Sequence, residues 1–182
     1  MKNKIIITFF LVIVISCMNP QPRKPIIHKT SSTYLKESID LNKELNQKEE
    51  LVFEELMKLD SLSTYHSSSQ GFWYKIEFKN TTSYFPKKGD ELNFSYEISN
   101  LNSEIIYSFD EIGLQQYFFE EQEMITGIRE GLKLMNEGDV FTFLFPSHKM
   151  YGYLGDQNKI SVNQPLIIKI NLRKIEKSNE NN

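Results

Sequence analysis

The chain has 182 residues, room for one domain and an appendage, and its 40% hydrophobic and 13% aromatic content suits a packed core. A formal net charge of −3 and a pI near 5.7 give no electrostatic reason to expect a nucleic-acid-binding protein. The sequence also lacks a Gly-rich phosphate loop and an internal repeat of fixed period, which excludes the common nucleotide-binding and repeat architectures.

Residues 1–16 have the features of an export signal. Lys2 and Lys4 precede a largely apolar run over residues 5–15 that is too short to span a bilayer comfortably. The run ends at Ser16-Cys17, which resembles a bacterial lipobox although Val14 stands where leucine is usual. We therefore expect a lipid on Cys17, a membrane anchor, and a location in the cell envelope facing the periplasm. The alternative is an ordinary signal peptide with a leftover thiol. Cys17 is the only cysteine of the chain, so it cannot form an internal disulfide.

Two segments separate this signal from the domain. Residues 17–31 contain Pro20, Pro22 and Pro25, which is typical of a stiff, extended tether. Residues 32–66 lack proline and glycine and carry apolar residues near helical spacing among many charges, so one long helix or two shorter ones are expected. Three interpretations stay open for these helices: a solvated spacer, a homodimer or partner contact, and packing on the domain.

Residues 67–176 are predicted to form an α+β domain, followed by a disordered tail at 177–182. Apolar and polar residues alternate over residues 72–78, 92–98 and 166–173, a period of two that indicates half-buried strands. With the apolar residues 140–145 they predict an antiparallel sheet, curved around one short helix at about residues 124–135. Gly127 and Gly131 lie four residues apart on one face of this helix, which predicts a close approach to the sheet.

An ordered set of motifs resembles the FK506-binding-protein (FKBP) type of peptidyl-prolyl cis-trans isomerase over about residues 69–175. The set comprises SQGFWYKI at 69–76, FPKKGD at 85–90 leading to Tyr96, GIREGLKLM at 127–135 with Gly138-Asp139, Pro146, Tyr151-Gly152, and LIIKI at 166–170. With the signal, the lipobox and the helical segment included, the whole chain resembles the gliding-motility-associated FKBP-like lipoprotein of Bacteroidetes bacteria.

The resemblance implies an apolar pocket that isomerises X–Pro bonds without a metal or cofactor. It assigns catalytic positions to Tyr96, the backbone N–H of Ile125, and Tyr151. It assigns substrate-binding positions to Ile106, Tyr107, Glu123, Met124, Ile128, Ile160 and Ile168. Core packing is the alternative interpretation of Tyr96 and Tyr151.

Three departures from the family pattern predict weak activity. Ile128 stands where the pocket floor is usually tryptophan, and Ile168 where a phenylalanine is expected. The usual phenylalanine–aspartate pair falls on Ile106-Tyr107, so the pocket aspartate is missing. The sequence therefore supports three hypotheses: a membrane-anchored isomerase for proline-containing exported clients, a chaperone or assembly factor that binds such clients with little turnover, and a structural lipoprotein of a motility or secretion assembly.

Other chemistries are not supported by the sequence. His28, His66 and His148 are scattered without the spacing of zinc ligands, and no serine lies in a nucleophile elbow. The acidic residues at 120–123 are interpreted as an exposed charge run.

Overall fold

The computed structural model describes residues 31–178. The expectations for the signal segment, Cys17, most of the tether and the last tail residues fall outside this range. The chain divides into two units, Met1–Ile39 and Asp40–Asn182. Of the first unit the structure describes only the start of a long helix, so the account below concerns the second.

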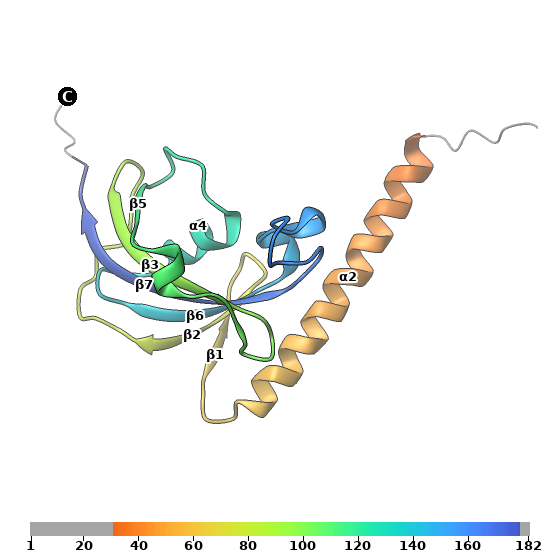
Figure 1. Cartoon of the computed structure of the whole chain (residues 1–182), viewed down its shortest axis with the longest axis horizontal. Helices are drawn as coiled ribbons and strands as arrows, with labels where there is room; N and C mark the ends of the chain where they lie inside the picture. The colour runs from red at the N-terminus through yellow and green to blue at the C-terminus, as the bar shows by residue number, and fades with distance from the viewer. Residues whose placement is uncertain (1–30, 179–182) are drawn as a thin grey trace, which may run out of the picture. The chain divides into compact units, whose positions relative to one another are not determined.

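The second unit contains most of the long helix and a seven-stranded sheet (Figure 1). The helices are α2 (Ser31–Leu59), α3 (Phe109–Ile112) and α4 (Thr126–Leu132), with two 3-10 turns, η1 (Ser147–Lys149) and η2 (Gly152–Leu154). The strands are β1 (Tyr65–Ser67), β2 (Trp73–Phe78), β3 (Glu91–Ser99), β4 (Ile105–Tyr107), β5 (Gln115–Phe118), β6 (Val140–Phe145) and β7 (Leu166–Glu176).

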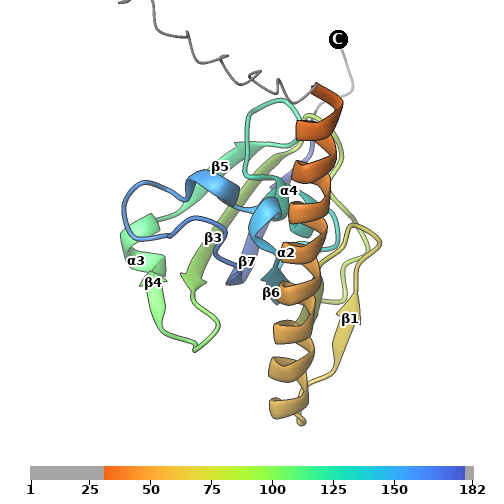
Figure 2. The same cartoon turned by 90° about the vertical axis from the view of Figure 1, so that its right-hand side faces the viewer.

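All strand pairs are antiparallel, which confirms the predicted sheet type. The strand order is β1-β2-β6-β7-β3-β4, and β5 pairs with β3 outside this path. Figure 2 shows β3, β7 and β6 side by side. The long central strand β7 buries Leu166, Ile168, Ile170 and Leu172, so the alternation in its sequence matches its burial.

Helix α4 lies over one face of the sheet, and its two glycines make the contact (Figure 1). A Cβ atom built on Gly131 would lie 3.1 Å from Phe143 Cζ and 3.3 Å from Phe145 Cζ, both on β6. One built on Gly127 would lie 2.7 Å from Met150 Sδ and 3.1 Å from the Lys149 carbonyl oxygen. A side chain at either position would hold the helix away from these neighbours. The predicted close approach is confirmed. Gly131 approaches β6, and Gly127 approaches both β6 and the segment that follows it.

Several elements differ from the sequence prediction. Strands β1, β4 and β5 were not predicted because three or four residues are too short to show a period of two. The helix ends at Leu132, three residues before the predicted end. Ile76 and Phe78 do not extend the buried face of β2; both are exposed, because a register shift between them marks the end of the regular pairing with β6.

The half of α2 in the second unit packs on the other face of the sheet. Phe53 is fully buried, and Leu56 lines the same hollow as Leu144 of β6 and Ile167 of β7. Trp73 donates its indole Nε1–H to Glu50 at 2.8 Å. Of the three interpretations left open for this helix, packing on the domain therefore holds for its second half.

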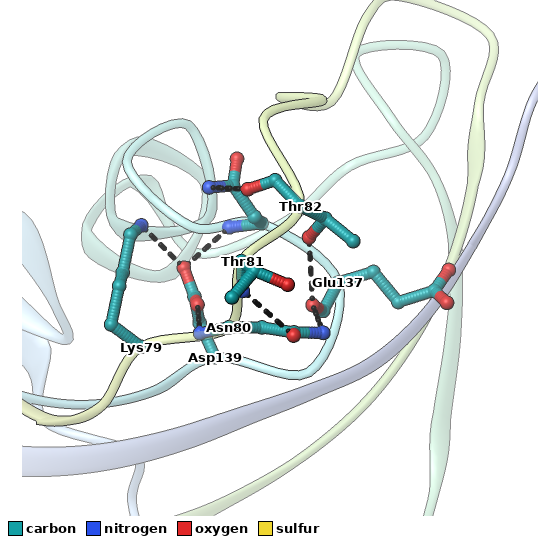
Figure 3. Close-up of polar contacts among 7 residues, drawn as sticks. Lys79, Asn80, Thr81, Thr82, Glu137 and Asp139 are labelled. Carbon is teal, nitrogen blue, oxygen red and sulfur yellow. Dashed lines mark hydrogen bonds and ion pairs between the residues drawn. The ribbon is translucent and has the colours of Figure 1, made fainter.

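The turn from α4 into β6 is fixed by a buried carboxylate (Figure 3). Asp139 is fully buried and accepts hydrogen bonds from Lys79 Nζ at 2.6 Å, Asn80 N at 2.8 Å and Asn136 N at 2.7 Å. The side chain of Asn80 also donates to the Glu137 carbonyl oxygen at 2.8 Å. The polar residues of this turn thus bond one another.

The described residues contain neither a membrane-spanning helix nor a group of metal ligands. Between residues 31 and 178 no helix is both long and apolar enough to cross a bilayer. Within the same residues, no three His, Cys, Asp or Glu side chains are grouped as a metal site requires.

Candidate functional site

Three tyrosines from different parts of the chain lie near one another, and Met150, which precedes one of them, lies against Gly127 of α4. Tyr96 lies on β3, Tyr107 ends β4, and Tyr151 lies between η1 and η2. Burial raises the pKa of Tyr151 far above its usual range, and the nearby Tyr96 and Asp156 add to the rise. Burial also raises the pKa of Tyr96. Both hydroxyls therefore stay protonated at neutral pH and can donate a hydrogen bond.

Neither of these two hydroxyls has a hydrogen-bond partner among residues 31–178. The only ring contact of Tyr96 in this range is with Phe94, whose centroid lies 5.9 Å away. Tyr96 and Tyr151 are half-buried and pack against the hydrophobic core. A bound ligand would therefore find two free donors in an apolar wall.

Tyr107 differs because a carboxylate already binds its hydroxyl. Its O–H donates to Asp156 Oδ2 at 2.5 Å, and Asn158 Nδ2 donates to the same hydroxyl at 3.0 Å. The bond to Asp156 raises the pKa of Tyr107. Burial opposes ionisation of Asp156, but this hydroxyl and the N–H groups of Ile160 and Asn158 together hold the pKa of Asp156 below its usual range.

Asp156 is a site residue that the sequence analysis missed. The pocket aspartate expected beside Ile106 is absent, yet a carboxylate reaches this place from the loop before β7. Asp156 Oδ1 accepts from Ile160 N at 2.7 Å and from Asn158 N at 2.9 Å, which shapes the loop. The Gly155-Asp156 pair followed by Asn158 is a turn signal, but it does not reveal which tyrosine the carboxylate contacts.

Lys159 covers the edge of this cluster. Its Nζ lies 4.5 Å from the centre of the Tyr107 ring and donates to the Ile106 carbonyl oxygen at 3.2 Å. It also pairs with Glu111 at 2.5 Å. Ile106 and Tyr107 are thus held by the loop before β7, and the free polar groups belong to Tyr96 and Tyr151.

The entry to α4 supplies the third predicted catalytic group. Ile125 is the N-cap of the helix, and its carbonyl oxygen accepts from Arg129 N at 3.0 Å. Its own N–H donates to no acceptor among the described residues. Met124 and Ile125 are half-buried and pack on the hydrophobic core.

The four remaining predicted site residues are either buried in the core or lie outside this cluster. Ile128 and Ile168 are fully buried, and Ile160 nearly so, so a ligand in this structure meets none of their surface directly. Glu123 is exposed and lines a charged depression with Arg129 and Lys133. The structure therefore places Tyr96, Tyr107, Tyr151, Ile106, Met124 and Ile125 half-buried against the hydrophobic core, and the Glu123 side chain in the charged depression. Tyr96 and Tyr107 lie near Tyr151.

The chemistry open to this cluster is limited to binding and electrostatics. It offers aromatic and aliphatic walls, two free tyrosine hydroxyls and one free backbone N–H. These groups can bind carbonyl oxygens of a ligand. The arrangement suits a ligand with an apolar ring and adjacent amide carbonyls.

Comparisons with known proteins identify the family of the chain. A sequence profile described as FKBP-type peptidyl-prolyl cis-trans isomerase matches residues 82–173. Among solved structures, the fold is similar to a peptidyl-prolyl cis-trans isomerase from Pseudomonas syringae pv. tomato str. DC3000, with a TM-score of 0.59 and 17% identity over 74% of this chain and 96% of that chain. No curated protein matches this chain. At this identity the structural likeness concerns the fold alone.

Proposed function

This chain belongs to the FKBP-type peptidyl-prolyl cis-trans isomerase family, and we propose that it isomerises X–Pro bonds of exported proteins at the Tyr96–Ile125–Tyr151 cluster. The observation that carries the proposal is the set of free donors at this cluster. Among residues 31–178, the hydroxyls of Tyr96 and Tyr151 and the N–H of Ile125 have no hydrogen-bond partner, and all three residues pack against the hydrophobic core.

The reaction needs no nucleophile, metal or cofactor. Amide resonance gives the X–Pro bond a rotation barrier of ~18–20 kcal/mol and places negative charge on the carbonyl oxygen. The twisted transition state has lost this resonance and is less polar. An apolar site therefore binds the twisted amide better than the planar one, which lowers the barrier.

The free donors would fix the substrate. We assign the Ile125 N–H and the Tyr151 hydroxyl to carbonyl oxygens flanking the proline, and Tyr96 to the wall beside the ring. Holding these carbonyls leaves the prolyl amide as the bond that turns. The pair formed by Tyr107 and Asp156 would hold the loop that closes the site.

The experiment is exchange NMR on a blocked prolyl tetrapeptide with the full chain. Tyr151→Phe should lower kcat/KM about fivefold while the melting temperature is kept, because one donor is lost and the ring remains. Tyr34→Phe, the same change at an exposed tyrosine of α2, is the control and should leave kcat/KM unchanged. Wild-type protein that does not accelerate exchange would contradict the proposal.

A second candidate is client binding with little turnover. Complete burial of Ile128 supports it, because a floor without exposed surface gives the proline ring less apolar contact than an open pocket would. Peptide binding detected by chemical shifts at Tyr96 and Tyr151, with exchange unaccelerated, would favour this function over catalysis.

We further propose that Cys17 is lipidated and anchors the chain to a membrane, where it serves gliding-motility or secretion components. The support is the sequence of residues 1–17 and its resemblance to the gliding-associated lipoprotein. In the source bacterium, wild-type protein should incorporate labelled fatty acid and Cys17→Ala should not. Equal labelling of the two proteins would contradict the anchor. Normal gliding and normal secretion in a strain lacking the chain would contradict the motility assignment.

A further inference from the structure

A groove lies beside the candidate prolyl site, on the side of Tyr151 that faces α2. It has a volume of about 500 Å³ and is bounded by α2 and by the segment from η1 through η2. Its apolar lining comes from Leu45, Met150, Tyr151, Tyr153 and Leu154. Ligand pockets commonly measure ~300–1,000 Å³, so the groove is large enough to bind part of a polypeptide.

The polar side chains that line the groove are those of Asn42 and Asn46 of α2, Ser147, His148 and Asn163, and no Asp, Glu, Lys or Arg contributes. Burial lowers the pKa of His148, so its imidazole is uncharged at neutral pH. Charged residues make up 25% of the chain, and the depression at Glu123 consists almost entirely of them. A carboxamide both donates and accepts hydrogen bonds, so it can bind the N–H and C=O groups of an extended backbone whatever its sequence.

Two groove residues are unusually exposed for their type. Tyr153 is 76% exposed and Leu154 is 56% exposed, and both lie within three residues of Tyr151. They continue the aromatic and aliphatic surface of the candidate prolyl site toward α2. The groove and the site therefore share Tyr151 as a common wall.

The two walls of the groove are fixed to each other by a buried carboxylate. Glu49 of α2 is 4% exposed, and its Oε2 accepts from the backbone N–H of Ser147 at 2.9 Å. This bond holds α2 against the start of η1, four residues before Tyr151. A groove with fixed walls loses little entropy when a ligand binds.

We propose that this groove binds an extended, uncharged stretch of the client polypeptide next to the proline whose bond is turned at Tyr151. The proposal rests on the function assigned above and extends the site beyond the proline. It also accounts for a site with a buried floor, because binding energy from remote parts of a substrate can support catalysis at the reacting bond.

The test compares two peptides with the same prolyl core. One is a blocked tetrapeptide; the other extends the core by about four uncharged residues on each side, enough to reach ~13 Å beyond it. Exchange NMR with the full chain gives kcat/KM for each. We expect kcat/KM to be about tenfold higher for the long peptide than for the short one, through a lower KM. Burial of one leucine side chain contributes binding free energy of this size.

The variant Leu45→Glu should reduce this ratio to about one, because a carboxylate in the groove disfavours an apolar peptide. Leu51→Glu is the matched control: it makes the same change at an exposed leucine of α2 that does not line the groove, and it should keep the ratio. Leu154→Ser repeats the test on the other wall at an exposed position, where loss of folding is not expected.

Each outcome separates the groove from the prolyl site. If the wild type isomerises the tetrapeptide but its kcat/KM is the same for both peptides, the isomerase proposal stands and the groove proposal is wrong. A raised ratio that Leu45→Glu and Leu154→Ser both leave unchanged also overturns it. If neither peptide is turned over, the isomerase proposal fails, and calorimetric binding of the long peptide then decides: binding lost in Leu45→Glu but kept in Leu51→Glu supports the groove, and no binding overturns it.

Discussion

The two ends of α4 use their polar groups in opposite ways. At the C-terminal end, Asp139 is fully buried and has three hydrogen-bond donors around its carboxylate. At the N-terminal end, Tyr96, Tyr151 and the Ile125 N–H are free within the described residues. Groups that bond one another stabilise the fold, whereas free groups in an apolar region are available to a ligand.

The largest expected effect is at the C-terminal end. Asp139→Ala should destabilise the domain by ~3 kcal/mol, because the buried Asn136 N–H loses its acceptor and the bonds to Lys79 and Asn80 are lost too. Urea unfolding of both proteins measures this.

The control for Asp139→Ala is Asp156→Ala, which removes a less buried carboxylate at the other end. It should cost ~1 kcal/mol or less, since water can replace the carboxylate as the acceptor for its three donors. Equal losses for the two variants would contradict the distinction between the ends.

The sequence predicted the elements whose signals are local and missed the contacts between residues far apart in the chain. The strands at 92–98, 140–145 and 166–173 and the glycine face of α4 were predictable because period and spacing are local. Asp156 was not, because its partner Tyr107 lies 49 positions earlier and no local pattern records that pairing. The hydrogen bond between Glu49 and Ser147 joins residues 98 positions apart, so the sequence could not predict that α2 packs on the domain there.

A second comparison uses the glycines in the helix between the ends. Gly131→Leu should cost ~1–3 kcal/mol of unfolding free energy, because the side chain would enter the space of Phe143 and Phe145. Gly127→Ala should instead change the free energy of unfolding by ~1 kcal/mol or less, because the helix propensity gained with alanine offsets part of the strain that the methyl group imposes. The methyl group would lie 2.7 Å from the flexible Met150 sulfur and 3.1 Å from the Lys149 carbonyl oxygen, so the segment before Tyr151 shifts and kcat/KM should fall about threefold.

Urea unfolding and exchange NMR on the same two variants decide this second comparison. An unchanged midpoint for Gly131→Leu would mean that the rings of β6 make room for the side chain. Unaltered kcat/KM for Gly127→Ala would mean that Met150 moves without shifting Tyr151.

The smallest expected effect concerns the charge on Asp156. Its pKa in the folded protein lies below the ordinary value near 3.8, so its bonds to Tyr107, Ile160 and Asn158 are complete above about pH 4. They weaken as the pH falls through the lower folded value, because protonation then favours the unfolded loop. We expect kcat/KM of the wild type to fall about threefold as the pH falls through the lowered pKa of Asp156, and that of Asp156→Asn to be lower by about the same factor at pH 7 and independent of pH over that range. The shape of the pH profile distinguishes a positioning carboxylate from a merely structural one. An Asn variant as active as the wild type at pH 7 would show that Asp156 does not hold the site.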